Sequence, residues 1–130
     1  MLTVQLIAAV NTLSDEQEPA ANVLEYLNDA MARINIRLKA NLPYLTLVEG
    51  DQPIFDEKWQ RALLIPFGVG RIKQQDSSQF EYSDAYQEFE INLADMAVQY
   101  AIPEIYKDEA PYSSDSMPGL YENAPYGWNW

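Results

Sequence analysis

The side chains that could carry chemistry in this chain are carboxylates, amines, guanidinium groups and hydroxyls, because its 130 residues include neither histidine nor cysteine. This composition excludes the usual general base, the commonest zinc ligand, thiolate nucleophiles and disulfides. The densest acidic clusters are Asp15, Glu16 and Glu18, and Asp108 with Glu109. Such acids could form a magnesium site or a carboxylate pair. Both clusters fall in predicted loops near proline, where nothing pre-organises them, so we favour solvated acids.

A nucleotide-binding signal is also missing from the sequence. The single Gly-Val-Gly, at residues 68–70, falls inside a predicted helix and not between a strand and a helix. It lacks the remaining glycine and the lysine of a phosphate-binding loop. No nucleophile has a base within a recognisable motif. We therefore expect a protein that is not an enzyme and that needs no metal or other cofactor.

The net charge of −12 is unevenly distributed along the chain. Residues 1–74 carry nine acids and seven bases, whereas residues 75–130 carry eleven acids and one base. One interpretation is a solvated, soluble surface. Another is a surface that repels a polyanion such as DNA. The bases cluster only at Arg33, Arg37 and Lys39, so we expect no nucleic-acid-binding face.

The first residues, MLTVQLIAAV, lack the basic start and the small-residue cleavage site of a secretory signal. No stretch of the chain approaches the length needed to span a bilayer. We therefore expect a chain that is made and kept in a cytoplasm, or in something assembled there, without a membrane partner.

The elements that must position these side chains are organised around residues 59–100, which predict two helices joined by a polar turn. The second helix places large side chains at alternating steps of four and three, the spacing of one helix face: Tyr82, Tyr86, Phe89, Leu93, Met96 and Tyr100. The first helix has a similar apolar stripe: Trp59, Leu63, Phe67 and Gly70. We expect the two stripes to pack together in the core of a bundle.

Three residues of the first helix modify its geometry. Pro66 removes one amide hydrogen bond, so we expect a kink between Leu63 and Pro66. Gly68 and Gly70 permit close approach of another backbone. In the turn that follows, Asp76, Ser77 and Ser78 are good N-cap residues for the second helix.

Two further helices are predicted before this pair. Residues 2–13 predict a short amphipathic helix, and residues 20–40 predict a long one whose core face includes Val23, Leu27 and Ile34. On the opposite side of the long helix, a run at four-residue spacing favours ion pairs along the surface: Glu25, Asp29, Arg33 and Arg37. Residues 41–57 break this periodicity with Pro43, Gly50 and Pro53, and could form a short β-hairpin with a turn at Glu49–Asp51.

These patterns predict an all-α protein, a small antiparallel bundle of about four helices over residues 1–102, followed by an extended arm over residues 103–130. Prolines at 103, 111, 118 and 125 prevent a helix in the arm. The arm is nevertheless rich in side chains that carry binding energy at interfaces: Tyr106, Tyr112, Met117, Leu120, Tyr121, Tyr126, Trp128 and Trp130. We expect either an arm that docks on a different subunit or protein, or an arm that folds back over its own bundle.

Two stretches carry a resemblance to a known family. They are LEYLNDAMARIN at residues 24–35 and WQRALLIPFGVGRIKQQDSSQFEYSDAYQEF at residues 59–89, a helix followed by paired helices with a glutamine and serine turn. In these stretches the chain resembles the head-to-tail connector, or adaptor, proteins of tailed bacteriophages. The resemblance covers roughly residues 1–107, and the rest of the arm matches no element of that family.

The resemblance implies a structural protein of the virion neck. Such proteins form a ring, usually of twelve copies, below the portal protein, and join the capsid to the tail or to a stopper protein. Genomic DNA passes through the ring without specific binding, and a C-terminal extension commonly reaches the portal. Assembly would take place in the host cytoplasm. Many arms that engage one portal would act at high effective concentration, so a modest affinity of each arm would give tight attachment.

Two other classes of function stay open from the sequence. One is a monomeric acidic effector that mimics DNA and binds a basic partner through the carboxylates of residues 76–109. The other is an assembly chaperone that covers an aromatic-binding groove and then departs. The effector would bind in a salt-sensitive manner and sediment as a monomer, whereas the chaperone would be absent from mature particles.

Overall fold

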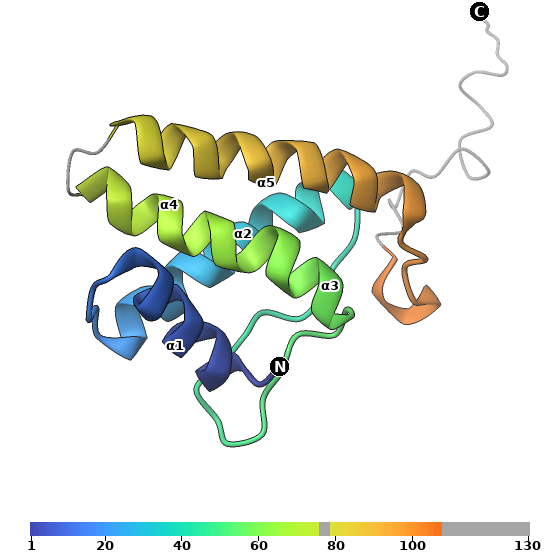
Figure 1. Ribbon diagram of the computed structural model, residues 1–130. Coiled ribbons are helices and arrows are strands. Elements are labelled where there is room, and N and C mark those ends of the chain that lie inside the picture. Colours follow the sequence, from blue (N-terminus) through green and yellow to red (C-terminus); the bar gives the residue numbers. More distant parts are fainter. Residues whose placement is uncertain (76–78, 108–130) are drawn as a thin grey trace, which may run out of the picture.

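The computed structural model describes residues 1–75 and 79–107 of the chain, and within them the fold is all-α, as predicted (Figure 1). The elements in chain order are α1 (Thr3–Ser14), α2 (Ala20–Leu38), α3 (Glu57–Trp59), the π-helical η1 (Gln60–Leu64), α4 (Ile65–Gln75), α5 (Gln79–Gln99) and the 3₁₀ turn η2 (Glu104–Tyr106). No described helix is long and apolar enough to cross a membrane. The predicted N-cap residues Asp76, Ser77 and Ser78 lie outside the described residues.

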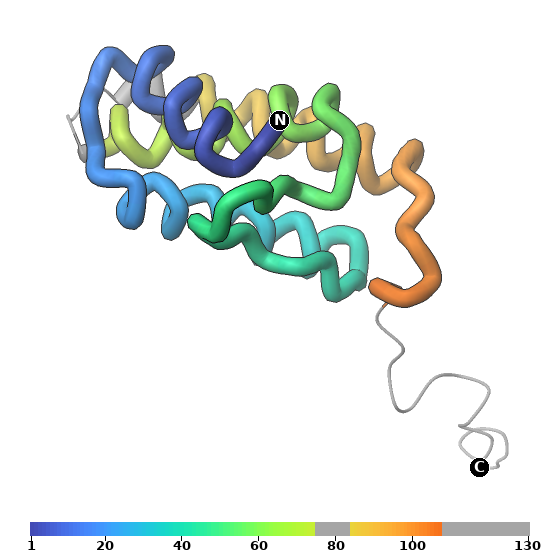
Figure 2. Tube along the Cα trace, turned by 90° about the horizontal axis from the view of Figure 1, so that it is seen from below, coloured from blue at the N-terminus to red at the C-terminus, as the bar shows by residue number. Residues whose placement is uncertain are grey.

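Helix α4 is the centre of the bundle, because α1, α2 and α5 all pack against it. Figure 1 shows α5 along one side of α4 and α1 along the other, and Figure 2, seen from the side of α1, agrees with this order. The elements α3, η1 and α4 follow one another without a break, so residues 57–75 form one continuous helical segment. The predicted pair of packed helices over residues 59–100 is therefore present.

The predicted core residues meet along α4. Phe67 is almost fully buried, and its ring centroid lies 4.9 Å from that of Phe89 and 5.4 Å from that of Tyr86. Tyr86 itself is partly buried against the core. The other predicted core residues are buried: Val23, Leu27, Ile34, Trp59, Leu63, Phe89, Leu93 and Met96. Full burial of one such side chain stabilises the fold by about 1.5–3 kcal/mol, so this cluster is the main source of stability.

The helix distortion expected near Pro66 takes the form of a π-helical turn. Residues Gln60–Leu64 form η1, and the amide of Ile65 donates to the carbonyl oxygen of Gln60, five residues earlier. Proline at position 66 has no amide proton to donate in the next turn. A change in helical hydrogen bonding directly before Pro66 is therefore consistent with the sequence.

The two glycines of α4 lie against side chains of other helices. A Cβ atom on Gly68 would lie 2.9 Å from Cγ2 of Val10 in α1, and a Cβ atom on Gly70 would lie 3.0 Å from the ring of Tyr86 in α5. Both distances are shorter than ordinary contacts between carbon atoms. Gly68 and Gly70 thus leave room for side chains of two different helices, while the predicted close approach of another backbone stays a prediction.

The possible β-hairpin over residues 41–57 does not form, and the structure corrects that expectation. Residues 41–56 run as an irregular segment with a turn in which the amide of Asp51 donates to the carbonyl of Val48 at 3.0 Å, and Gly50 has a φ of 86°. The predicted turn is thus present without the predicted strands. The backbone N–H and C=O groups of Leu42 and Leu45 form hydrogen bonds with the side-chain amides of Asn35 and Asn28 in α2. In a hairpin, a second strand would form such bonds.

Candidate functional site

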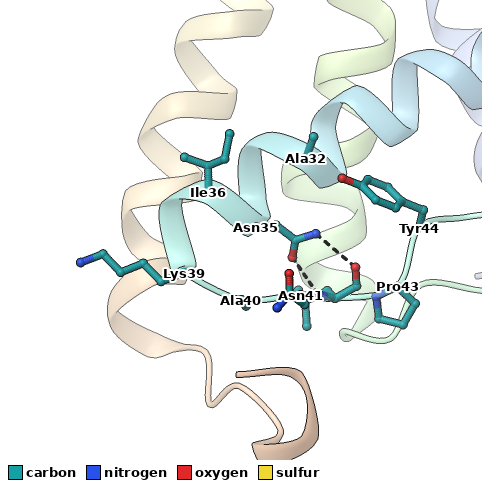
Figure 3. Close-up of a pocket in the computed structure, with 9 residues that line it drawn as sticks. Ala32, Asn35, Ile36, Lys39, Ala40, Asn41, Pro43 and Tyr44 are labelled. Atoms are coloured by element: carbon teal, nitrogen blue, oxygen red, sulfur yellow. Dashed lines mark hydrogen bonds between the residues drawn. The ribbon is translucent and has the colours of Figure 1, made fainter. Parts of the chain in front are cut away.

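A groove lies where the C-terminal end of α2 meets the segment that follows it (Figure 3). Its volume is about 560 Å³. Ile36 and Tyr44 on its surface are exposed, whereas Ala40 and Leu42 are buried. The lining residues are Ala32, Asn35, Ile36, Lys39, Ala40, Asn41, Leu42, Pro43 and Tyr44. The groove therefore combines an apolar surface with one cation, Lys39, at its edge.

Asparagine side chains of α2 hold the wall of this groove in place. The Oδ1 atom of Asn35 accepts the amide of Leu42 at 2.8 Å, and its Nδ2 donates to the carbonyl of Leu42 at 3.1 Å (Figure 3). Two turns earlier, Asn28 makes the same pair of bonds with Leu45, at 2.7 and 3.0 Å. Each amide thus replaces a neighbouring strand for one residue, and the extended segment is fixed along α2 without a sheet.

A third asparagine uses the same geometry at the other end of the bundle. Asn11 of α1 accepts the amide of Glu18 and donates to its carbonyl, both at 3.1 Å. The acids Asp15, Glu16 and Glu18, one of the two densest acidic clusters of the sequence, line a hollow beside this bond. Among the described residues, no three acidic side chains are placed to hold a metal ion together.

The end of the helical body returns to the groove. Lys107 forms an isolated antiparallel bridge with Ala40, and the amide of Asn41 donates to the carbonyl of Tyr106 at 2.7 Å. Tyr106 is partly buried against the core. The segment 103–107, predicted as the start of the arm, therefore packs on the body, and its last residue, Lys107, lies beside Ala40 of the groove.

Of the predicted arm residues, only Tyr106 falls within the described part of the chain. Its packing against the core does not test the predicted contact with a partner, which stays a prediction. The others lie outside the described residues: Tyr112, Met117, Leu120, Tyr121, Tyr126, Trp128 and Trp130.

A basic face lies on the exposed side of α2, and we define it by Arg33, Ile36 and Arg37. The guanidinium of Arg33 lies 5.3 Å from the ring centroid of Phe67, and that of Arg71 from α4 lies 5.0 Å from the same centroid. Both arginines line a hollow of about 530 Å³. Two cations from helices distant in sequence are thus brought together by one aromatic ring.

The ion pairs predicted along α2 differ from those in the structure. Asp29 pairs with Arg71 of α4, with 2.7 Å between Oδ2 and Nη1. The predicted partner, Arg33, has no carboxylate within 4.0 Å among the described residues. The sequence could not reveal this exchange, because Arg71 follows Asp29 by 42 residues.

An acidic face lies on the outer side of α5, and we define it by Asp84, Glu88, Ile91 and Asp95. These residues are exposed and recur at steps of four, three and four, opposite the buried Phe89, Leu93 and Met96. None of its three carboxylates lies within 4.0 Å of a cation among the described residues. Three of the acids in residues 75–130 therefore lie together on one face of α5.

In the part of the chain that the structure describes, Glu57 and Tyr100 have shifted pKa values, and both lie outside these faces. The hydrogen bond from Arg61, together with its charge, lowers the pKa of Glu57 at the start of α3. Burial, with a smaller contribution from Asp56, raises the pKa of Tyr100. The Tyr100 ring meets that of Phe55 edge-on, with 6.2 Å between centroids. The shift of Glu57 reflects its ion pair with Arg61 at the start of α3, and the shift of Tyr100 reflects burial directly after α5.

No protein-family model, curated protein or solved structure matches this chain.

Proposed function

We propose that this chain is a structural protein of the neck of a tailed bacteriophage. In this proposal, copies of the chain form a ring below the portal protein, extend the channel for genomic DNA, and join the capsid to the tail or to a stopper protein. The arm, residues 108–130, binds the portal or a neighbouring copy. The resemblance at residues 24–35 and 59–89 is the starting point, and these residues lie in α2 and in the α4 and α5 pair.

The observation that carries the proposal is the fixed origin of the arm. The bridge between Ala40 and Lys107 and the bond between Asn41 and Tyr106 hold the chain at one end of the body. From this point, 23 further residues rich in aromatic side chains continue to the C-terminus, Trp130. A helical body continued by a segment rich in aromatic side chains that can bind a partner suits a protein that joins two larger assemblies.

The overall acidity of the chain supports the same proposal, because genomic DNA must pass through the ring. The net charge is −12, and residues 75–130 carry eleven acids and one base. A surface of this charge repels a phosphate backbone instead of retaining it. That property is required of a conduit through which a genome must slide.

The test is assembly of particles with a chain that ends at Lys107. All contacts of the helical body described above are kept in this truncation, so we expect an unchanged helical circular dichroism spectrum. Electron microscopy should then show capsids with portals but without the ring and without tails. Tailed particles at the normal frequency would refute the proposed role of the arm.

A full-length variant tests whether attachment needs the aromatic side chains of the arm or only its length. Replacing Trp128 and Trp130 with alanine should reduce ring attachment, because it removes two large interface side chains. The matched control replaces Ser113 and Ser114 with alanine in the same arm and should attach normally. Equal attachment of both variants would mean that the two tryptophans are not anchors.

The acidic face also favours one competing function, a monomeric effector that mimics DNA. In that case the chain would bind a basic DNA-binding protein, and replacing Asp84, Glu88 and Asp95 with asparagine or glutamine would weaken the binding and its dependence on salt. Purified particles would lack the chain. Imaging of the particle neck therefore decides between the two functions.

A further inference from the structure

We propose that the basic face of α2 binds the acidic face of α5 on a second copy of this chain. The inference rests on the proposed function for its setting, a ring of copies. Its physical argument comes from the two faces themselves, which carry opposite charge and a similar arrangement of side chains. Because the two faces lie on different helices, one copy can use both at once, which gives a head-to-tail contact between neighbours.

The basic face is compact and has no carboxylate partner of its own. Residues at positions i, i+3 and i+4 of a helix are surface neighbours, so Arg33, Ile36 and Arg37 form one patch. Ile36 lies between the two arginines in this patch and is 78% exposed. Neither arginine has a carboxylate within 4.0 Å among the described residues. Asp29, one turn before Arg33, is paired with Arg71 instead.

The position of Arg33 is constrained by aromatic contact. Its guanidinium lies against the Phe67 ring, and the Phe67 side chain is 1% exposed. Contact with a buried ring limits the freedom of the long arginine side chain before any partner binds. The hollow beside it is lined by Tyr26, Arg33, Arg71, Gln74 and Tyr86. It provides space for a carboxylate side chain next to the guanidinium of Arg33, whereas that of Arg71 is already paired with Asp29.

The acidic face has the complementary arrangement. Ile91, which is 60% exposed, lies three residues after Glu88 and four before Asp95. Asp84 and Glu88 are separated by one turn, about 6 Å along the helix axis. Arg33 and Arg37 have the same separation. An exposed isoleucine flanked by acids can therefore meet an exposed isoleucine flanked by arginines, with ion pairs on the edge of an apolar contact.

The expected strength of one such contact is low. Each solvent-exposed ion pair strengthens binding by about fivefold at most, and the apolar contact is small. A ring multiplies the contact and fixes neighbours at high local concentration, so weak pairwise binding is sufficient once a template is present. The isolated chain can accordingly be monomeric and still carry a specific interface.

The experiment exploits the absence of cysteine from the chain, which allows single cysteines to report on single sites. One full-length copy carries Ile36→Cys and another carries Ile91→Cys. The copies are mixed at low ionic strength under oxidation, and the mixed disulfide is quantified by mass spectrometry. A disulfide requires Cα atoms within about 7 Å, so it captures even a transient contact at this position.

We expect the mixed disulfide to form about tenfold faster than the Ile36→Cys or Ile91→Cys homodimers, as two or more surface ion pairs allow. High salt should remove the difference. Leu13→Cys supplies the control, since this residue of α1 is 63% exposed and lies on neither face. Mixed and control pairs that form at equal rates would overturn the inference, and so would a faster homodimer.

Charge reversal tests the same contact independently. Arg33→Glu with Arg37→Glu, introduced in the Ile36→Cys copy, should abolish the rate advantage. Asp84→Lys with Glu88→Lys in the Ile91→Cys copy should restore it. Failure of this restoration, with normal circular dichroism for both copies, would also overturn the inference. The chain can also be mixed with a short DNA duplex. If it binds the duplex, and Arg33→Glu with Arg37→Glu abolishes the binding, the basic face is a nucleic-acid site instead.

The outcomes separate this inference from the proposed function. Specific cross-linking in solution, together with particles that lack the chain, would support the interface and refute the neck protein. A ring in the particle neck whose neighbouring copies do not cross-link through Ile36→Cys and Ile91→Cys would support the neck protein and refute this interface.

Discussion

The side-chain amide of Asn92 in α5 donates a hydrogen bond to the carbonyl oxygen of Ala62, at 3.0 Å. Ala62 lies four residues before Pro66, at the position whose carbonyl an α-helix would pair with the amide of residue 66. Proline cannot provide that donor. A side chain from the neighbouring helix thus satisfies a carbonyl affected by the proline, and the distortion of one helix is coupled to the packing of the next.

We expect Asn92→Ala to lower the free energy of unfolding by about 1 kcal/mol, because the carbonyl of Ala62 loses a donor. In a Pro66→Ala background, the restored amide can replace that donor and the same change should cost less. Urea denaturation of the four members of this double-mutant cycle gives the coupling, which should exceed about 0.5 kcal/mol. Additive effects would mean that Asn92 does not compensate for the proline.

The paired hydrogen bonds of Asn35 and Asn28 should stabilise the segment after α2. Asn35→Ala removes both bonds to Leu42 and is expected to cost about 2 kcal/mol, at about 1 kcal/mol for each bond. Asn35→Asp keeps the acceptor for the Leu42 amide but loses the donor, so its cost should be intermediate. Hydrogen exchange at the Leu42 amide should be faster in Asn35→Ala, which removes its acceptor, and less affected in Asn35→Asp, which keeps it.

The matched control for this prediction is Asn41→Ala, since the Asn41 side chain is exposed in the same segment. Its effect should stay within about 0.5 kcal/mol of zero. If Asn41→Ala and Asn35→Ala destabilised the protein equally, the bonds of Asn35 could not be the cause.

Gly68→Ala should destabilise the protein although alanine is the better helix former. The new Cβ would meet Val10, a β-branched and fully buried side chain that has little freedom to move. We expect overpacking of about 1–3 kcal/mol to outweigh a gain in helix propensity of about 1 kcal/mol. Thermal denaturation should show the loss, and adding Val10→Ala should recover part of it. A stabilised Gly68→Ala variant would contradict the close contact between α1 and α4.

The raised pKa of Tyr100 predicts a loss of stability in alkali. Because burial raises the pKa of this phenol above its ordinary value of 10.0, the folded state binds the phenolic proton more tightly than the unfolded state. The contribution of this proton to stability is fully present below pH 10 and is lost as the pH rises through the folded-state pKa. Tyr100→Phe keeps the ring contact with Phe55 and removes the ionisation.

Between neutral pH and the range above pH 10, the unfolding free energy of Tyr100→Phe should therefore fall less than that of the unmodified chain. Urea denaturation at several pH values measures the difference. Tyr44→Phe is the control, because the Tyr44 side chain is exposed and should not alter the profile. Parallel pH profiles for Tyr100→Phe and the unmodified chain would exclude Tyr100 as a source of alkaline sensitivity.

The helices and their buried faces could be predicted from the sequence because their information is local. Leu63 and Phe67 lie at helical spacing in one predicted helix, and Phe89 and Leu93 do so in the next. The structure buries all four. Pro66 and the glycines beside it also indicated a distortion and a close approach. In each case the physical cause lies within a few residues of its effect.

The contacts that shape the candidate surfaces could not be predicted in this way. The neighbouring sequence does not indicate that Asp29 pairs with Arg71 instead of Arg33. It also does not indicate that the side chains of Asn28 and Asn35 form hydrogen bonds with the backbone of Leu45 and Leu42. Amides spaced by seven residues beside the core face of α2, followed by an extended segment, were the available signal for the second feature. The return of Lys107 to Ala40 had no signal, because it depends on where α5 ends in space.

The bridge between Ala40 and Lys107 has a mechanical consequence. Tension applied to the chain beyond residue 107 reaches the end of α2 first, through the bridge and the adjacent bond between Asn41 and Tyr106. Helix α5 would carry load only after these contacts had yielded. A tether that pulls on this protein would thus be resisted first at a short backbone junction behind α2, before α5 carries load.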